Sequence, residues 1–356
     1  MKRLFSEVIQ KGFAYGFFFT LMLSCSDKKE ENARPKPQIR FEKPAHFPEP
    51  AYDMSSNPVS QAGFELGRAL FYEPMFSRDN SISCGSCHQQ SAGFTHHGHA
   101  LSHGINDRIG FRNAQPIMNL AWGKSFMWDG GVISLDLFPP APVANPVEMD
   151  ESMANVLQKL RRSSRYPNMY QKAFGDTSIS FARTVKAMSQ FMLMCISGES
   201  PYDLWRTGKG IFSNDEKEGY ELVKSRCGNC HSGELFTDES FRNNGIGDGR
   251  GRKDYGRESI TLQPTDKYKF KVPTLRNLGF TAPYMHDGRF LTLDAVLNHY
   301  SSGVKNIPNL DSSLVQDGVL GIPLSPSEKQ KILAFLNSLN DENFRKKTEL
   351  SEAAAQ

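Results

Sequence analysis

The sequence lacks several features that would each point to a particular class of protein. After the first 25 residues no stretch is apolar enough to span a membrane, and Lys and Arg form no basic cluster of the kind that binds nucleic acid. Strand-like alternation is scarce, and the 356 residues include only six cysteines. With a net charge of +3 and 38% hydrophobic residues, the composition is that of an ordinary globular chain and predicts no nucleic-acid partner.

The N-terminus has the pattern of an export signal. Two basic residues precede a short apolar run, Phe13–Leu23, that is too short to cross a bilayer. The following Ser-Cys pair resembles a bacterial lipoprotein signal, in which the cysteine, here Cys25, is lipidated. We therefore predict a signal peptide over residues 1–25, with a plain secretory signal as the alternative, and a charged tether over residues 26–57. The expected location is the periplasm or outer cell envelope, with the lipid as the only membrane contact.

Two copies of one motif contain four of the six cysteines: Cys84-Gly-Ser-Cys87-His88 and Cys227-Gly-Asn-Cys230-His231. Two thiols at this spacing can both reach the vinyl groups on one edge of a porphyrin, and the adjacent imidazole can bind the iron. The first copy also fits a zinc finger if His99 and His103 complete it. The second copy has no such pair downstream, and a closed zinc site needs four ligands. The motifs therefore predict two covalently bound haem c groups.

The repeat extends beyond these motifs. Each copy follows a segment with apolar residues at helical spacing, residues 64–71 in one case and 218–223 in the other. Each is also followed by a loop with an Asp-Gly turn, because residues 126–136 (FMWDGGVISLD) align with residues 284–294 (YMHDGRFLTLD). This pattern predicts an internal duplication.

The duplication predicts the domain organisation. We expect a mainly α fold with two cytochrome c-like domains, residues 58–200 and 201–342, connected by long loops and followed by a tail over residues 343–356. Cys195 lies in an apolar helical segment with no activating base nearby, so it is predicted to be a buried, unreactive thiol.

These residues together resemble the bacterial di-haem cytochrome c peroxidases and their MauG-type relatives. The similarity spans residues 58–340 and rests on LFYEPMFSRDNSISCGSCH, GFRNAQP, MWDGG, NPVEM, CGNCH, VPTLRN and APYMHDGRFLTL. The resemblance implies one haem in each helical domain, in communication, with His88 and His231 as proximal iron ligands. It also implies hydrogen peroxide as substrate and a small cytochrome c or copper protein as electron donor, and it is compatible with a homodimer.

The resemblance also assigns residues around the first haem. Glu148 matches a distal-pocket glutamate, whose carboxyl can move a proton between the two peroxide oxygens; the alternative is a solvated surface glutamate. Trp128 matches a tryptophan between the haems that relays electrons, with simple core packing as the alternative. His103 is the best match to a removable distal iron ligand, unless it only lines the pocket. Three neighbouring imidazoles have no family role and are expected to be solvated or hydrogen-bonded, with a surface metal site as the alternative: His96, His97 and His99.

A calcium ion between the domains is a further implication of the resemblance. The Asn113 side chain and the backbone carbonyls of Thr281 and Pro283 match the family's ligands for this ion. Oxygen ligands of this kind, completed by water, suit a hard cation.

The second haem departs from the common family pattern. Many relatives have a methionine as sixth ligand fourteen residues after the His of His-Asp-Gly, but counting from His286 reaches Tyr300. A phenolate is a hard anionic ligand that favours oxidised iron, and the resemblance places it in the MauG-type branch. Met285 and His299 are alternative ligands close by.

We therefore predict a di-haem peroxidase that reduces hydrogen peroxide to water. One alternative is a MauG-type oxidase that uses peroxide to modify a partner protein, which Tyr300 favours. The other is a di-haem electron carrier without catalysis, in which Glu148 would have no role.

Overall fold

The computed structural model describes residues 39–248 and 251–352. The predicted signal peptide and Cys25 lie outside the described residues. From Ile39 onward the chain forms one unit, in which we call the described residues up to 200 the N-terminal half and those from 201 the C-terminal half.

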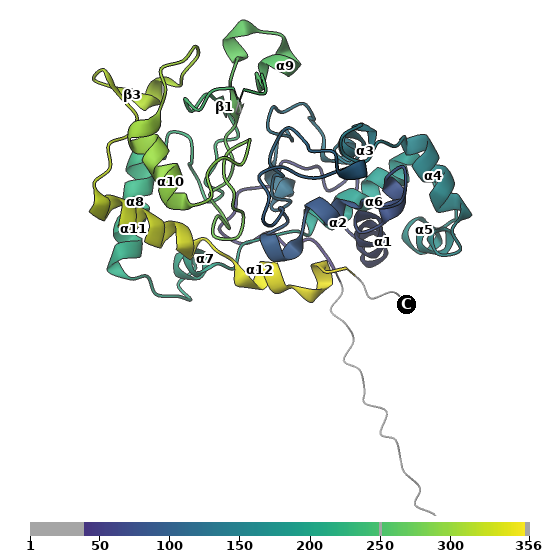
Figure 1. The fold of residues 1–356 in the computed structure, drawn as a ribbon. Coiled ribbons are helices and arrows are strands. Elements are labelled where there is room, and N and C mark those ends of the chain that lie inside the picture. The colour runs from purple at the N-terminus through teal and green to yellow at the C-terminus, as the bar shows by residue number, and fades with distance from the viewer. Residues whose placement is uncertain (1–38, 249–250, 353–356) are drawn as a thin grey trace, which may run out of the picture. The chain divides into compact units, whose positions relative to one another are not determined.

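A crossed pair of helices forms the core of the N-terminal half. Helix α1 (Gln61–Phe71) begins at Ser60, whose side chain accepts a hydrogen bond from the Gly63 amide, and it packs against α6 (Phe181–Leu193) (Figure 1). The two helices touch at Gly67, where a Cβ atom would lie 1.9 Å from the carbonyl oxygen of Ala187. A side chain at this position would push the helices apart.

The C-terminal half repeats this arrangement. Helix α8 (Asn214–Arg226) packs against α11 (Pro326–Ser338), and each begins with a capping box formed by a serine and a glutamate. The contact again lies at a glycine, because a Cβ atom on Gly219 would be 2.0 Å from the carbonyl oxygen of Lys331. The duplicated helices predicted from the sequence are therefore present in both halves.

The two Asp-Gly loops also have the same conformation. Met127 and Met285 each adopt a left-handed backbone, with φ of 69° and 73°. The residues that flank each turn pair in the same way, Phe126 with Val132 and Tyr284 with Phe290. This confirms the alignment of residues 126–136 with residues 284–294.

The remaining structure is short helices and long loops, as predicted for a mainly α fold. Strands occur only as two antiparallel two-residue pairs within the described residues, β1 with β2 and β3 with β4. No helix in the described ranges is long and apolar enough to cross a membrane. The other elements are α2 (Cys84–Cys87), α3 (Pro140–Ala144), α4 (Met153–Arg162), α5 (Tyr166–Phe174), α7 (Pro201–Arg206), α9 (Glu258–Thr261), α10 (Leu293–Asn298), a π-helical turn (His299–Gly303), α12 (Glu342–Lys346), β1 (Phe241–Arg242), β2 (Phe270–Lys271), β3 (Val315–Gln316) and β4 (Val319–Leu320).

Residues at both ends of the described chain pack against the core, although the predicted boundaries placed them outside the two domains. Phe47, in the predicted tether, is only 3% exposed, and the Trp122 indole donates a hydrogen bond to the Pro48 carbonyl. In the predicted tail, α12 places Phe344 5.5 Å from Phe94, between ring centroids. The packed chain therefore includes residues on both sides of the predicted 58–342 span, while the division near residue 200 stays a prediction.

Candidate functional site

The two predicted proximal histidines have matching surroundings. In each motif the histidine amide donates to the carbonyl of the first cysteine at 2.9 Å. The Nδ1 atoms of His88 and His231 each lie 3.0 Å from a backbone carbonyl, that of Phe94 and Phe236 respectively. Burial lowers the pKa of both imidazoles, so both are neutral, and with Nδ1–H donating, each Nε2 keeps a free lone pair. That is the arrangement that a metal-ligating histidine needs.

The four cysteines of the motifs are free thiols, so each is available to form a thioether. Burial raises the pKa of Cys84 to about 12 and that of Cys227 to about 11, because a thiolate would be poorly solvated there. The buried surroundings of these sulfur atoms fit attachment to an apolar group such as a haem vinyl.

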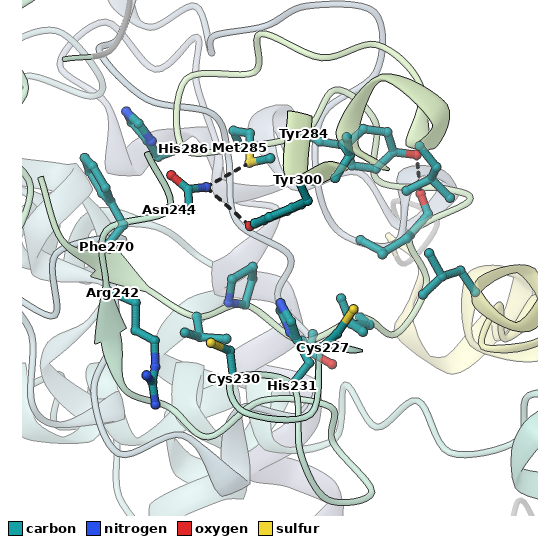
Figure 2. A pocket seen from close by; sticks show the side chains of 18 of the residues that line it. Cys227, Cys230, His231, Arg242, Asn244, Phe270, Tyr284, Met285, His286 and Tyr300 are labelled. Carbon is teal, nitrogen blue, oxygen red and sulfur yellow. Dashed lines mark hydrogen bonds between the residues drawn. The ribbon is translucent and has the colours of Figure 1, made fainter. Parts of the chain in front are cut away.

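A cavity of about 210 Å³ lies above the second motif. One side is formed by Cys227, Cys230 and His231, and Tyr300 lies across the cavity from them (Figure 2). Much of the wall between is apolar, including Leu297 and other leucine, isoleucine and valine side chains. Two thiols, an imidazole, a facing phenol and apolar walls fit a haem c.

Tyr300 belongs to the π-helical turn that follows α10. Such turns are often found at functional sites. The Asn244 amide nitrogen lies 3.4 Å from the Tyr300 hydroxyl and 3.4 Å from the Met285 sulfur, as Figure 2 shows. The Asn244 side-chain oxygen accepts from the Ile246 amide, and this contact sets the orientation that turns the NH₂ group toward Tyr300.

Of the other two candidate ligands, His299 already has a hydrogen-bond partner, whereas Met285 makes the same contact as Tyr300. His299 Nε2 lies 3.0 Å from the Asn244 carbonyl oxygen, so this nitrogen already has a partner. The Met285 sulfur contacts the same amide group as the phenol. Burial raises the pKa of Tyr300 to about 12, and the Asn244 hydrogen bond works in the opposite direction by stabilising the phenolate. Tyr300 therefore presents to the cavity a phenol oxygen that accepts one hydrogen bond, from Asn244.

Glu148 lies beside the first motif. The Asn145 amide donates to its carboxylate at 2.7 Å, and burial raises its pKa above the usual carboxyl value. Its charge in turn raises the pKa of both Cys84 and Cys87, so the carboxyl is close to the thiols. The loop after the motif rests on Glu148, because a Cβ atom on Gly104 would lie 2.5 Å from the Glu148 carbonyl oxygen. Glu148 is thus a partly buried carboxyl beside the first site, and its role as a proton carrier stays a prediction.

His103 also lies near the first motif, with its carbonyl oxygen 4.0 Å from the Cys87 sulfur. Its Nδ1 atom lies 2.5 Å from the Asp107 carboxylate, and its side chain is 35% exposed. Its role as an iron ligand stays a prediction. The rings of His96, His99 and His103 follow one another edge to face at 4.8 Å, but among the described residues no three His, Cys, Asp or Glu side chains are placed to hold a metal ion. The surface metal site is therefore not supported.

Trp128 and the predicted calcium residues lie on the wall of the second cavity. The Trp128 indole donates to the Asn113 carbonyl at 2.9 Å, and the Asn113 amide nitrogen donates to the Ala100 carbonyl at 3.0 Å. Thr281 and Pro283 line the same cavity. Trp128 therefore connects the loop of one half with the haem cavity of the other.

Two further side chains at this junction were not identified from the sequence. Arg112 bridges the halves with 2.5 Å and 2.7 Å contacts to Asp129 and Asp254. His286, which aligns with Trp128, is stacked on Phe270 at 3.7 Å, and burial lowers its pKa to about 4. Its Nε2 atom is buried without a hydrogen-bond partner. The alignment could have indicated His286, whereas the Arg112–Asp254 pair spans 142 residues and has no sequence signal.

Comparison with known proteins gives one consistent picture. The family model described as di-haem cytochrome c peroxidase matches residues 61–210. The methylamine utilization protein MauG of Methylorubrum extorquens is 36% identical over 317 residues, which cover 86% of this chain and 84% of the relative. The cytochrome c551 peroxidase of Nitrosomonas europaea is 32% identical, over 77% of this chain and 79% of the relative.

Solved structures agree with these sequence relatives. A MauG-like protein associated with microbial copper homeostasis aligns with a TM-score of 0.79 and 31% identity, covering 88% of this chain and 99% of that one. The diheme peroxidase BthA of Burkholderia thailandensis aligns with a TM-score of 0.71 at 19% identity, covering 86% and 93%. At that identity, the second match supports the fold alone.

Proposed function

The chain belongs to the di-haem cytochrome c peroxidase family, and from that premise we propose that it is a peroxidase that reduces hydrogen peroxide to water. Membership of this family implies two haem c groups. Cys84 and Cys87 would attach the first and Cys227 and Cys230 the second. When bound, the irons supply the site for peroxide and the capacity to hold and pass electrons.

The residues of the chain divide the work between the two sites. His88 and His231 would hold the irons from one side through Nε2. At the first site Glu148 would take a proton from one peroxide oxygen and give it to the other, which lets the second oxygen leave as water when the O–O bond breaks. Burial raises the pKa of this carboxyl above its usual value, so the carboxyl holds a proton more readily once it has accepted one. His103 would occupy or flank the same face.

Electrons would enter at the second site and pass to the first. Tyr300 would ligate the second iron, and Trp128, at the wall of that cavity, would relay electrons between the halves. The donor would be a small cytochrome c or a copper protein. Two electrons and two protons then convert one peroxide into two waters.

The observation that carries this proposal is that two matching Cys-Cys-His sites differ on their open sides, with Glu148 at one and Tyr300 at the other. The test is a steady-state assay of the holo protein with reduced cytochrome c. We expect peroxide-dependent oxidation of the donor. Failure of the holo protein to oxidise cytochrome c or a cupredoxin with peroxide would contradict the proposal.

A second candidate function is peroxide-driven oxidation of a partner protein, as in MauG-type oxidases. It is favoured by the Tyr300 phenol, which Asn244 contacts from the side. This function predicts that peroxide, added without donor, oxidises the protein by two electrons to a state that persists, and that this state is lost in Tyr300→Met. Rapid decay of the state in the absence of donor would favour the simple peroxidase.

The remaining assignments are parts of the same proposal. A calcium ion would bind near Asn113, Thr281 and Pro283, which share the cavity wall. The protein would be exported to the periplasm or outer cell envelope, where a lipid on Cys25 would hold it, and a homodimer is compatible with the family resemblance.

A further inference from the structure

A group of aromatic rings leads away from the proximal side of the second haem site. Phe236, whose carbonyl oxygen contacts His231 Nδ1, has its ring 5.1 Å from that of Tyr202. Tyr202 is buried, and its ring lies 6.0 Å from Trp205. Consecutive rings at these distances form a continuous path from the haem-binding histidine toward the outside.

The path ends at the protein surface. Trp205 is half-buried and is stacked on Phe212, with 4.6 Å between ring centroids and 7° between the planes. Beside it Leu204 is 41% exposed and Ile211 is 95% exposed. An electron that reaches Trp205 is therefore within reach of molecules in solution.

Tyr202 has a proton acceptor in place. Its hydroxyl donates to a carboxylate oxygen of Glu234 at 2.9 Å, and the other oxygen of Glu234 is held by Arg206 at 2.6 Å. A phenol that loses an electron becomes a strong acid, so a bonded carboxylate makes the loss easier. The Arg276 guanidinium, 5.9 Å from the ring, opposes this, but Asp203 pairs with it directly and offsets its charge.

The N-terminal half provides an internal comparison, because it lacks this chemistry in the same place. Phe94 holds His88 as Phe236 holds His231, but the rings packed around Phe94 are also phenylalanines, which resist oxidation: Phe71, Phe191 and Phe344. Tyr72, which contacts two of these rings, donates to the carbonyl oxygen of Leu350, which cannot take up a proton. Of the two phenylalanines that hold the histidines, Phe236 is thus the one whose ring contacts a tyrosine bonded to a carboxylate.

We propose that Tyr202 and Trp205 form a redox relay that carries single electrons between the protein surface and the haem held by His231. Tyr202 gives one electron to that haem while its phenolic proton moves to Glu234, which leaves a neutral tyrosyl radical. Trp205 then returns an electron to Tyr202 as the proton comes back from Glu234, and one electron from the proposed donor, a small cytochrome c or a copper protein, restores Trp205. Peroxide, which takes up two electrons and two protons to give two waters, is the oxidant. The relay rests on the proposed peroxidase function.

The test uses the holo protein, oxidised, with hydrogen peroxide and no electron donor. Rapid freezing and EPR should detect a protein radical whose lines narrow when the protein contains ring-deuterated tyrosine. Mass spectrometry of the same samples should find oxygen added to Trp205. In Tyr202→Phe the tyrosyl signal should be lost and Trp205 oxygenation should fall on the order of tenfold, which corresponds to about 1.4 kcal/mol in a barrier.

Matched variants keep the test decisive. Tyr72→Phe removes the tyrosine at the other site and should leave the radical unchanged. Glu234→Gln keeps the Tyr202 ring but removes the proton acceptor, so the radical yield should fall even if Tyr202→Phe folds poorly. A radical that survives both Tyr202→Phe and Glu234→Gln would overturn the relay. If the holo protein turns over peroxide with reduced cytochrome c but forms no radical at Tyr202, the relay is wrong and the peroxidase function stands; no reaction with peroxide would contradict both.

Discussion

The two halves of the molecule hold their histidines in the same way and face them with different chemistry. His88 and His231 share the motif, the backbone carbonyl partner at 3.0 Å and the burial that keeps them neutral. Glu148, the carboxyl beside the first site, is proposed to carry a proton, whereas Tyr300, the phenol across the second site, is an anionic donor once deprotonated. The side that binds the haem is thus duplicated, and the side that determines its reaction is not.

This difference shows where the duplicated fold tolerates change. The helix contacts at Gly67 and Gly219 leave no room for a side chain, so the scaffold around each proximal histidine is constrained. The open sides are built from loops, which accept different residues without loss of the core. One fold can therefore provide a peroxide site and an electron-transfer site in one chain.

The largest effect on activity is expected from removing the Glu148 carboxyl. Glu148→Gln should lower kcat with peroxide by about 10²- to 10⁴-fold, the usual contribution of a positioned acid–base group. The spectrum of the second haem should not change. Stopped-flow and steady-state rates test this, with the exposed Glu65→Gln as control. A loss of less than threefold would mean that Glu148 does not carry the proton.

The same variant should change the pH dependence of the rate. Burial raises the pKa of Glu148, so its carboxyl stays protonated to a higher pH than an ordinary glutamate. The wild-type rate should therefore rise with pH through a midpoint above the normal carboxyl range, as Glu148 loses its proton and can accept one from peroxide. This rise should be missing in Glu148→Gln. A rise with the same midpoint in both proteins would assign the titration to another group.

The halves also differ at one matched buried position, which holds an ion-paired side chain in the C-terminal half and a methionine in the N-terminal half. Asn119 and Asn277 have matching left-handed backbones, and the residue before each is Met118 in one half and Arg276 in the other. Arg276 is fully buried and binds Asp203 at 2.8 Å. Arg276→Ala should lower the free energy of unfolding by about 3–5 kcal/mol, because Asp203 is left buried without its guanidinium partner.

Denaturant unfolding of the holo protein measures this difference. The exposed pair Arg183–Asp176 is the control, since Arg183→Ala should cost less than about 1 kcal/mol. Equal losses in the two variants would show that the buried pair does not stabilise the C-terminal half.

The smallest expected effect concerns Asn244, the side chain that contacts the Tyr300 phenol. In Asn244→Leu the hydrogen bond that stabilises the phenolate is lost, so the Tyr300 pKa rises further. The phenolate-ligated form should then require a higher pH, by up to about one unit, equivalent to about 1.4 kcal/mol. Resonance Raman titration of the phenolate band measures this shift, with Asn229→Ala at the cavity edge as control. An unchanged midpoint in Asn244→Leu would exclude this contact as a determinant.

The motifs and their spacing were sufficient to predict the helical duplication and a di-haem family, and they led to the proposed haem attachment residues and to Tyr300, which stay predictions. These features depend on residues close together in sequence or on a repeat that can be aligned. The alignment also placed Met127 opposite Met285, which the backbone angles confirm.

The features that could not be predicted depend on contacts between distant segments. Asn244 reaches Tyr300 across 56 residues, and Tyr202 finds its proton acceptor 32 residues away. Neither asparagine nor glutamate in a loop indicates such a partner. Packing of the predicted tether and tail was also missed, because apolar residues such as Phe47 and Phe344 are isolated in polar segments.

One measurement tests the central claim, that two matching haem sites carry different open sides. Resonance Raman and EPR of the oxidised holo protein should be recorded for the wild type, Tyr300→Phe and Glu148→Gln. The account predicts a phenolate ligand on the haem held by His231, which is lost only in Tyr300→Phe. It predicts an open or His103-bound face on the haem held by His88, which is altered only in Glu148→Gln. A phenolate signal that survives Tyr300→Phe, or identical axial ligation at both haems, would contradict it.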